Sequence, residues 1–102
     1  MIADKSFEKY ALELFNYYQN KDFANAQDLA NLMIKKYPKN NLSWQILSFI
    51  YLEKGKIKDA YEAISNAHKI DPKDFKVLIN LGLILFKLGS NEKSISAFRK
   101  VL

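Results

Sequence analysis

Apolar side chains recur at helical spacing through most of the chain. Trp44, Leu47 and Tyr51 follow one another at intervals of three and four residues, which places them on one face of a helix. Ala60 and Ala67, seven residues apart, mark a second such face in the segment that follows. Large residues dominate the first face and small ones the second, so we expect the two helices to approach closely and interdigitate. The pattern predicts a pair of packed helices.

The same residue types return after an interval of 34. Pro38 and Pro72 are separated by this interval, and so are Gly55 and Gly89. A glycine can take the left-handed conformation that ends a helix, and a proline stops a helix from continuing. Further pairs at this spacing are Phe15 and Phe49, Tyr17 and Tyr51, Ala26 and Ala60, and Leu47 and Leu81. The chain is therefore predicted to repeat one structural unit.

This repeat predicts an all-α fold of six helices without strands. Asn40 and Asp74 precede two of the helices, at places where a side-chain oxygen would cap a helix N-terminus. The expected helices cover residues 7–19, 23–36, 41–53, 57–70, 75–87 and 91–102. Because one helix pair cannot bury its apolar face alone, stability is expected to come from the stacking of neighbouring pairs.

A 34-residue unit that ends in proline resembles the tetratricopeptide repeat. The resemblance covers nearly the whole chain, and the middle unit carries it best. The residues that match the family pattern are Tyr17, Ala26, Pro38, Trp44, Leu47, Tyr51, Gly55, Ala60, Ala67, Pro72, Leu81, Gly82, Gly89 and Phe98. The resemblance implies an α-α superhelix, or repeat solenoid, in one domain over residues 1–102. Its units would be 7–40, 41–74 and 75–102, the last one truncated.

The first unit departs from the family pattern at Glu13 and Leu14. The pattern has a large apolar residue followed by a small one at these two positions. The exchange predicts shifted or atypical packing at the start of the solenoid. Terminal repeats often deviate, because one of their faces meets water instead of a neighbour.

The resemblance also implies where a partner would bind, because in this family the first helix of each pair lines a concave groove. The groove residues that follow from the family positions are Phe15, Tyr18, Ile46, Phe49, Leu52, Lys76, Ile79, Asn80, Leu83 and Phe86. The other groove positions hold Glu8, Ala11, Leu12, Gln19, Leu42, Gln45, Glu53 and Lys87. Most of these groove residues are apolar, and an apolar groove is suited to binding an amphipathic helix or an apolar extended segment. The alternative is that much of it is ordinary core.

Chaperone adaptors of this family hold a carboxylate terminus with a clamp of lysine, asparagine and arginine side chains. The matching positions here are Ala11, Phe15, Ile46, Lys76 and Asn80, and only Lys76 fits the clamp. A chaperone-tail ligand is therefore not expected. The function predicted instead is a protein-binding scaffold whose groove holds an apolar or amphipathic segment.

The composition narrows the choice of partner and compartment. Among 102 residues there are 16 basic and 11 acidic side chains, and the net charge is +5. Arg99 is the only arginine, although arginine is the residue that phosphate and base recognition favours, so no nucleic-acid partner is expected. The sequence has no cysteine, no apolar run of membrane-spanning length and no signal-peptide pattern at its start. The predicted location is the cytoplasm, without a membrane partner.

Catalytic chemistry is not expected. His68 is the only histidine, and no partner at ligand spacing accompanies it. Gly82 and Gly89 have repeat-structural roles and do not form a phosphate-binding loop. The sequence therefore predicts no enzyme activity, no metal and no cofactor.

Two other functions stay open. Residues 36–44 and the unit that follows are similar to leading repeats of bacterial proteins that carry a glycosyltransferase or sulfotransferase domain downstream, so the chain could be an arm of a larger enzyme. The family pattern would also continue past Leu102, which leaves Ile95, Phe98 and Leu102 uncovered. This predicts either a fragment or a homo-oligomer formed through the uncapped last helix. A secretion-type chaperone with a hydrophobic client is a variant of the scaffold function.

Overall fold

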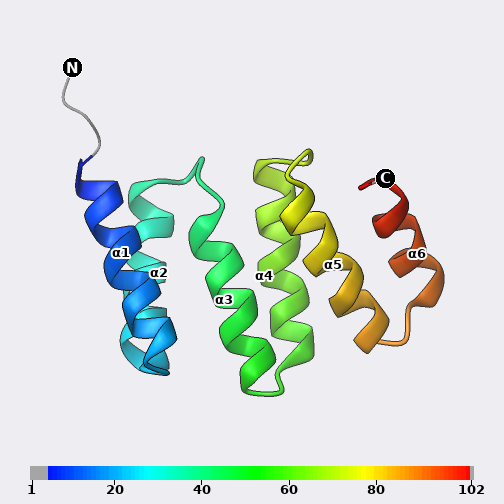
Figure 1. The fold of residues 1–102 in the computed structure, drawn as a ribbon, viewed down its shortest axis with the longest axis horizontal. Coiled ribbons are helices and arrows are strands. Elements are labelled where there is room, and N and C mark those ends of the chain that lie inside the picture. The colour runs from blue at the N-terminus through cyan, green and yellow to red at the C-terminus, as the bar shows by residue number, and fades with distance from the viewer. Residues whose placement is uncertain (1–4, 102) are drawn as a thin grey trace.

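Six helices in three antiparallel pairs make up the structure, a computed structural model that describes residues 5–101 and the side chains of residues 6–101. Figure 1 shows the pairs arranged side by side as a short solenoid. The elements are α1 (Lys5–Gln19), α2 (Phe23–Lys36), α3 (Leu42–Glu53), α4 (Ile57–Ile70), α5 (Phe75–Lys87) and α6 (Asn91–Arg99). Over the described residues there is no strand, and the all-α solenoid predicted from the repeat is confirmed.

Most helix boundaries agree with the repeat, and the differences have local causes. The end of α6 is earlier than predicted, at Arg99, because the Val101 N–H turns back to the carbonyl of Phe98 at 3.1 Å and tightens the last turn. Leu102 lies outside the described residues. At the start of α3 the capping residue is Asn41 instead of the expected Asn40. The Asn40 side chain, one residue before this cap, accepts the Leu42 N–H at 2.9 Å. It therefore satisfies one of the backbone donors that the helix itself leaves unpaired.

The turns inside the three pairs share one backbone conformation. Gly55 and Gly89 have φ of +75° and +84°, as expected for glycines that end helices. The equivalent residue of the first unit is Lys21, whose φ is +58°. A side chain in this region costs about 1 kcal/mol. The Lys21 ammonium also forms an ion pair with Glu53 at 3.3 Å, so this turn is tied to the next unit.

Consecutive helices pack on one another, and two buried clusters lie along the stack. The first joins the first two units and consists of Leu14, Ala26, Ala30, Met33, Ile46, Leu47, Ile50 and Ala63. The second joins the last two units and consists of Ala60, Ile64, Ala67, Val77 and Ile84. Trp44 and Tyr51 are half-buried and pack against both clusters. These two aromatic side chains therefore connect the halves of the core.

The departure at Leu14 is matched by an opposite change on the second helix of its unit. Leu14, Ser48 and Gly82 occupy one position of the repeat, and all three are buried. The position that follows 16 residues later holds Ala30, Ile64 and Phe98. A large residue on the first helix is thus accompanied by a small one on the second, and the reverse holds in the last unit.

In that last unit the fit is tight. A Cβ atom built on Gly82 would lie 2.6 Å from Cε1 of Phe98, closer than real contacts allow. The Phe98 ring therefore fills the space that a side chain at position 82 would take. The first unit has the opposite combination, with Leu14 at the position of Gly82 and Ala30 at the position of Phe98, and both residues belong to one buried cluster.

This size relationship gives a testable double substitution. Gly82→Leu alone should lower the free energy of unfolding by about 2 kcal/mol, because the new side chain overlaps Phe98. Phe98→Ala alone should lower it by a similar amount, because it leaves a void. The pair together recreates the first unit's combination and should be more stable than either single variant in urea unfolding. Strictly additive losses would show that the two positions do not share space.

The role of Trp44 as a link between the clusters gives a second prediction. Trp44→Ala should lower the free energy of unfolding by about 3 kcal/mol, because it removes apolar contacts on both sides. The measurement is urea unfolding followed by circular dichroism. Leu32→Ala, at a side chain that is 46% exposed on α2, is the control and should have a small effect. An unchanged midpoint for Trp44→Ala would mean that the two clusters are not connected through this ring.

Candidate binding groove

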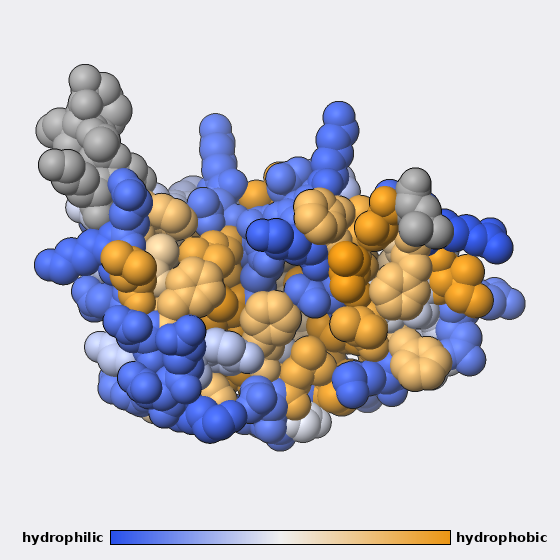
Figure 2. Space-filling model, viewed as in Figure 1, coloured by the Kyte–Doolittle hydropathy of each residue, from blue (hydrophilic) through white to orange (hydrophobic). Residues whose placement is uncertain are grey.

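The first helices of the three pairs, α1, α3 and α5, present apolar side chains to the surface. Figure 2 shows hydrophobic surface gathered across the middle of this face, with hydrophilic side chains above and below it. Phe15 is 41% exposed, Leu83 is 48% exposed and Phe86 is 63% exposed. An exposed group of this kind is typical of an interaction site. These residues come from positions where the family resemblance implied a groove.

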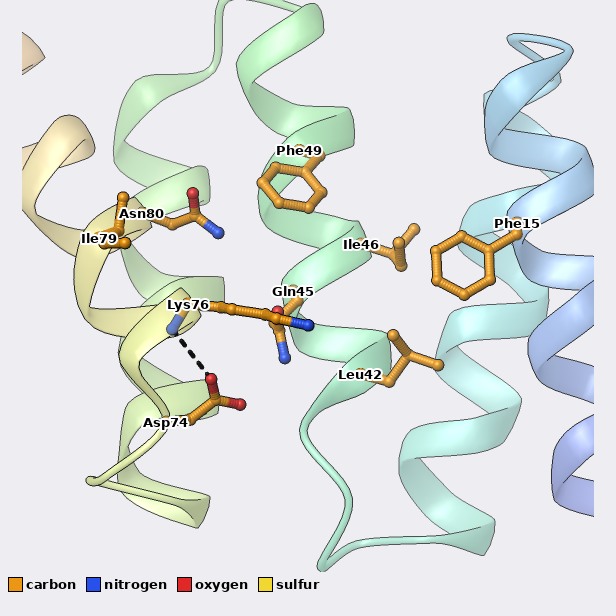
Figure 3. A pocket seen from close by; sticks show the side chains of 9 residues that line it. All are labelled: Phe15, Leu42, Gln45, Ile46, Phe49, Asp74, Lys76, Ile79 and Asn80. Atoms are coloured by element: carbon orange, nitrogen blue, oxygen red, sulfur yellow. Dashed lines mark hydrogen bonds between the residues drawn. The ribbon is translucent and has the colours of Figure 1, made fainter.

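A hollow of about 480 Å³ lies between these helices. Its lining residues come from α1, α3, α5 and the residue before α5, and they are Phe15, Leu42, Gln45, Ile46, Phe49, Asp74, Lys76, Ile79 and Asn80. Figure 3 shows that Phe15, Ile46 and Leu42 form an apolar side, whereas Lys76 and Asn80 lie on the α5 side. Every lining residue except Asp74 was expected at a groove position.

Ile46 differs in burial from the other apolar residues of the hollow. It is only 2% exposed and belongs to the core cluster between the first two units. Phe49 is half-buried and also packs against that cluster. Some of the residues predicted to line the groove therefore belong to the core, whereas Phe15 and Leu83 are exposed to solvent.

A second, smaller hollow of about 250 Å³ shares Phe49 with the first. It is lined by Tyr18, Phe49, Leu52, Glu53, Ile57 and Lys87. The Tyr18 ring lies 6.2 Å from the Phe49 ring and 6.0 Å from the ring of Phe23. Burial raises the pKa of Tyr18, the Glu53 carboxylate raises it further, and Lys21 lowers it. The hydroxyl at this end of the groove is therefore a neutral donor.

A chain of side-chain hydrogen bonds holds the polar end of the larger hollow. The Asn41 amide donates to Oδ2 of Asp74 at 3.1 Å, and the Gln45 amide donates to Oδ1 of Asn41 at 2.9 Å. The other Asp74 oxygen accepts the backbone N–H of Lys76 at 3.1 Å, a bond drawn in Figure 3. Asp74 thus caps α5, as expected, and also ties α5 to the start of α3.

Two groove residues were not predicted from the sequence. Asp74 was expected only as a helix cap, and Ile57 was not expected in the groove. A signal for Asp74 exists, because a cap residue two positions before Lys76 must lie beside it. Ile57 lies on α4, a second helix of its pair, so the rule that first helices line the groove excluded it.

Residues 5–101 contain no group of three or more metal-ligating side chains that could hold an ion. The Nδ1 atom of His68 is buried and has no hydrogen-bond partner, and His68 lines neither hollow. None of the described helices is long and apolar enough to cross a membrane.

Comparison with known proteins bears on the fold and the family. Residues 75–102 match the family model of the tetratricopeptide repeat. A TPR repeat-containing protein of Methanocaldococcus jannaschii is 37% identical over 59 residues, which cover 58% of this chain. The aligned part makes up 10% of that relative's length.

Three solved structures illustrate the similarity of the fold. The Yersinia enterocolitica type III secretion translocator chaperone SycD has a TM-score of 0.86 at 16% identity, over 98% of this chain and 75% of that one. PilW, a type IV pilus biogenesis factor, has a TM-score of 0.86 at 24% identity, over 97% and 46%. The second TPR domain of Spaghetti, bound to an HSP90 peptide, has a TM-score of 0.83 at 17% identity, over 91% and 86%.

The helix pairs, their shared core and the superposition on these structures define the chain as an α-α repeat solenoid. The third unit matches the tetratricopeptide-repeat model and the archaeal relative contains TPR repeats, so the chain is similar to this family in sequence as well as in fold.

The hydrogen bonds of Asp74 give a prediction for the groove. Asp74→Ala should lower the free energy of unfolding by about 1 kcal/mol, because α5 loses its cap and the tie to Asn41. Asp74→Asn should lose less, since its amide oxygen can still accept the Lys76 N–H. Asp28→Ala, an exposed position within α2, is the control. Urea unfolding of the variants measures the difference, and equal effects of Asp74→Ala and Asp28→Ala would contradict the assigned role.

Proposed function

We propose that the chain is a non-catalytic scaffold that binds a segment of another protein in the groove formed by α1, α3 and α5. The observation that carries the proposal is the exposure of large apolar side chains around the two hollows. Leu83 and Phe86 keep 48% and 63% of their surface exposed. Covering them with an apolar face of a partner would remove this surface from water and stabilise a complex.

The shape of the groove supports a peptide segment as the ligand. Its two hollows, about 480 and 250 Å³, share Phe49 and lie one toward each end of α3. Each hollow has an apolar wall and a few polar side chains at its edge, which would fix the orientation of a bound segment. Structures with this fold include one with a bound HSP90 peptide and one with an Hsp70 complex, so the architecture accommodates peptides in those proteins.

The expected ligand differs from a chaperone tail in its chemistry. The clamp positions carry Ala11, Phe15 and Ile46 where a carboxylate terminus would require amide or ammonium groups. We therefore propose an apolar or amphipathic segment as the ligand, with the buried Ile46 as part of the floor beneath it.

The test uses a substitution that changes the groove and spares the core. Leu83→Glu should reduce binding of the chain's partner by at least ten-fold, because it places a carboxylate on an apolar contact surface. Leu83 is better suited than Phe49, since Phe49 also packs against the core and its loss would destabilise the fold. Binding is measured by isothermal titration with peptides selected from a displayed random library.

Leu32→Glu is the matched control, because Leu32 is similarly exposed but lies on α2, which contributes no residue to either hollow, whereas Leu83 lies on α5, which lines both. It should leave binding unchanged, and both variants should retain the helical circular-dichroism spectrum. If Leu83→Glu binds the selected peptides as tightly as the unmodified chain, the groove is not the binding site.

A further inference from the structure

Two lysines of α5 stand at opposite edges of the groove. Lys76 lines the larger hollow and Lys87 lines the smaller one, and both are exposed. They are 11 residues apart, which is about 16 Å along a helix. Figure 3 shows the Lys76 side chain reaching from α5 over the hollow toward Gln45 of α3. The α5 end of the groove is therefore flanked by two ammonium groups.

The carboxylates that share these hollows are already engaged. Asp74 accepts hydrogen bonds from the Asn41 amide and from the backbone N–H of Lys76. Glu53 is paired with Lys21 at 3.3 Å. Among the side chains of residues 6–101, neither the Lys76 nor the Lys87 ammonium group forms an ion pair. Both ammonium groups therefore stay available to pair with carboxylates of a ligand.

The other units place different groups at the equivalent positions. Glu8 and Leu42 correspond to Lys76, while Gln19 and Glu53 correspond to Lys87. Along the groove, the edge positions therefore change from acidic or neutral on α1 and α3 to basic on α5. Between the two edges lie the exposed apolar side chains, including Leu83 and Phe86. A ligand in this groove meets an apolar floor along its length and positive charge at one end only.

We propose that the groove binds an amphipathic helix whose acidic end lies between Lys76 and Lys87. The inference rests on the proposed function and adds the partner's charge pattern and its orientation. A helix with its side chains is 10–12 Å across, so two lysines whose backbone positions are about 16 Å apart can contact both of its flanks. The charges determine the orientation, because only this end of the groove attracts carboxylates.

The chemistry of the groove selects a protein helix over a polyanion. A phosphate backbone would pair with the lysines but would leave Leu83 and Phe86 exposed to water. An amphipathic helix covers the apolar side chains and supplies carboxylates at the same time. The partner is therefore expected to carry leucine-like side chains on one face and glutamate or aspartate near one terminus.

The experiment selects ligands from a phage-displayed library of random peptides built on a helical frame. Selection against the unmodified chain should enrich acidic residues at one end of peptides that have an apolar face. Lys76→Glu with Lys87→Glu should weaken these peptides by about five- to ten-fold at low ionic strength, with a smaller effect at high salt.

The control reverses two lysines elsewhere with the same spacing. Lys58 and Lys69 are exposed on α4 and also stand 11 residues apart, outside both hollows. Lys58→Glu with Lys69→Glu changes the net charge equally and should leave affinity for the selected peptides nearly unchanged. Equal weakening by the two double variants would overturn the proposal, because it would mean that overall charge alone attracts the peptides.

A spin label on the acidic end of a selected peptide tests the orientation. Its broadening of amide signals should be strongest for α5, at Lys76 and Lys87, and weak for α1. Strongest broadening on α1 would contradict the proposal. Peptides that depend on Leu83 but show no acidic enrichment would also overturn it while leaving the groove as the binding site. If no selected peptide depends on Leu83, the proposed function itself fails.

Discussion

The stacking of one helix pair on the next is the constraint on which the structure depends. No pair here has a closed core of its own, since both buried clusters take residues from adjacent units. Trp44 and Tyr51 contact both clusters, and the Asn41–Asp74 hydrogen bond adds a polar tie between successive units. The groove follows from this packing, because a stack built in one register places α1, α3 and α5 on the same surface.

The helix α5 serves both the core and the groove. Its residues Val77 and Ile84 are completely buried against the preceding unit, while Leu83 and Phe86 on other sides of the helix stay open to solvent. Apolar residues are therefore present around most of this helix, which is unusual for a surface helix with one buried face. The exposed ones are the side chains on which the proposed binding role rests.

The sequence predicted the fold well because the repeat gives two kinds of information, the spacing of the helices and the places where they end. A 34-residue period fixed the register, and Gly55, Gly89 and the prolines marked the helix ends. Burial was harder to predict, because repeat position alone does not tell how far a side chain is covered. Ile46 and Phe15 both occupy groove positions, yet one is buried beneath the surface and the other is open. The binding role of the groove residues remains a proposal.

The reciprocal sizes of Leu14 with Ala30 and of Gly82 with Phe98 bear on how such repeats can evolve. Copying a whole unit carries both partners along and preserves their fit. A genetic crossover that falls between the two helices of a unit would instead join a leucine to a phenylalanine, or a glycine to an alanine. The leucine–phenylalanine unit would have too much side-chain volume between its helices, and the glycine–alanine unit would have a cavity there. We therefore expect viable exchanges to have their junctions in the loops between units.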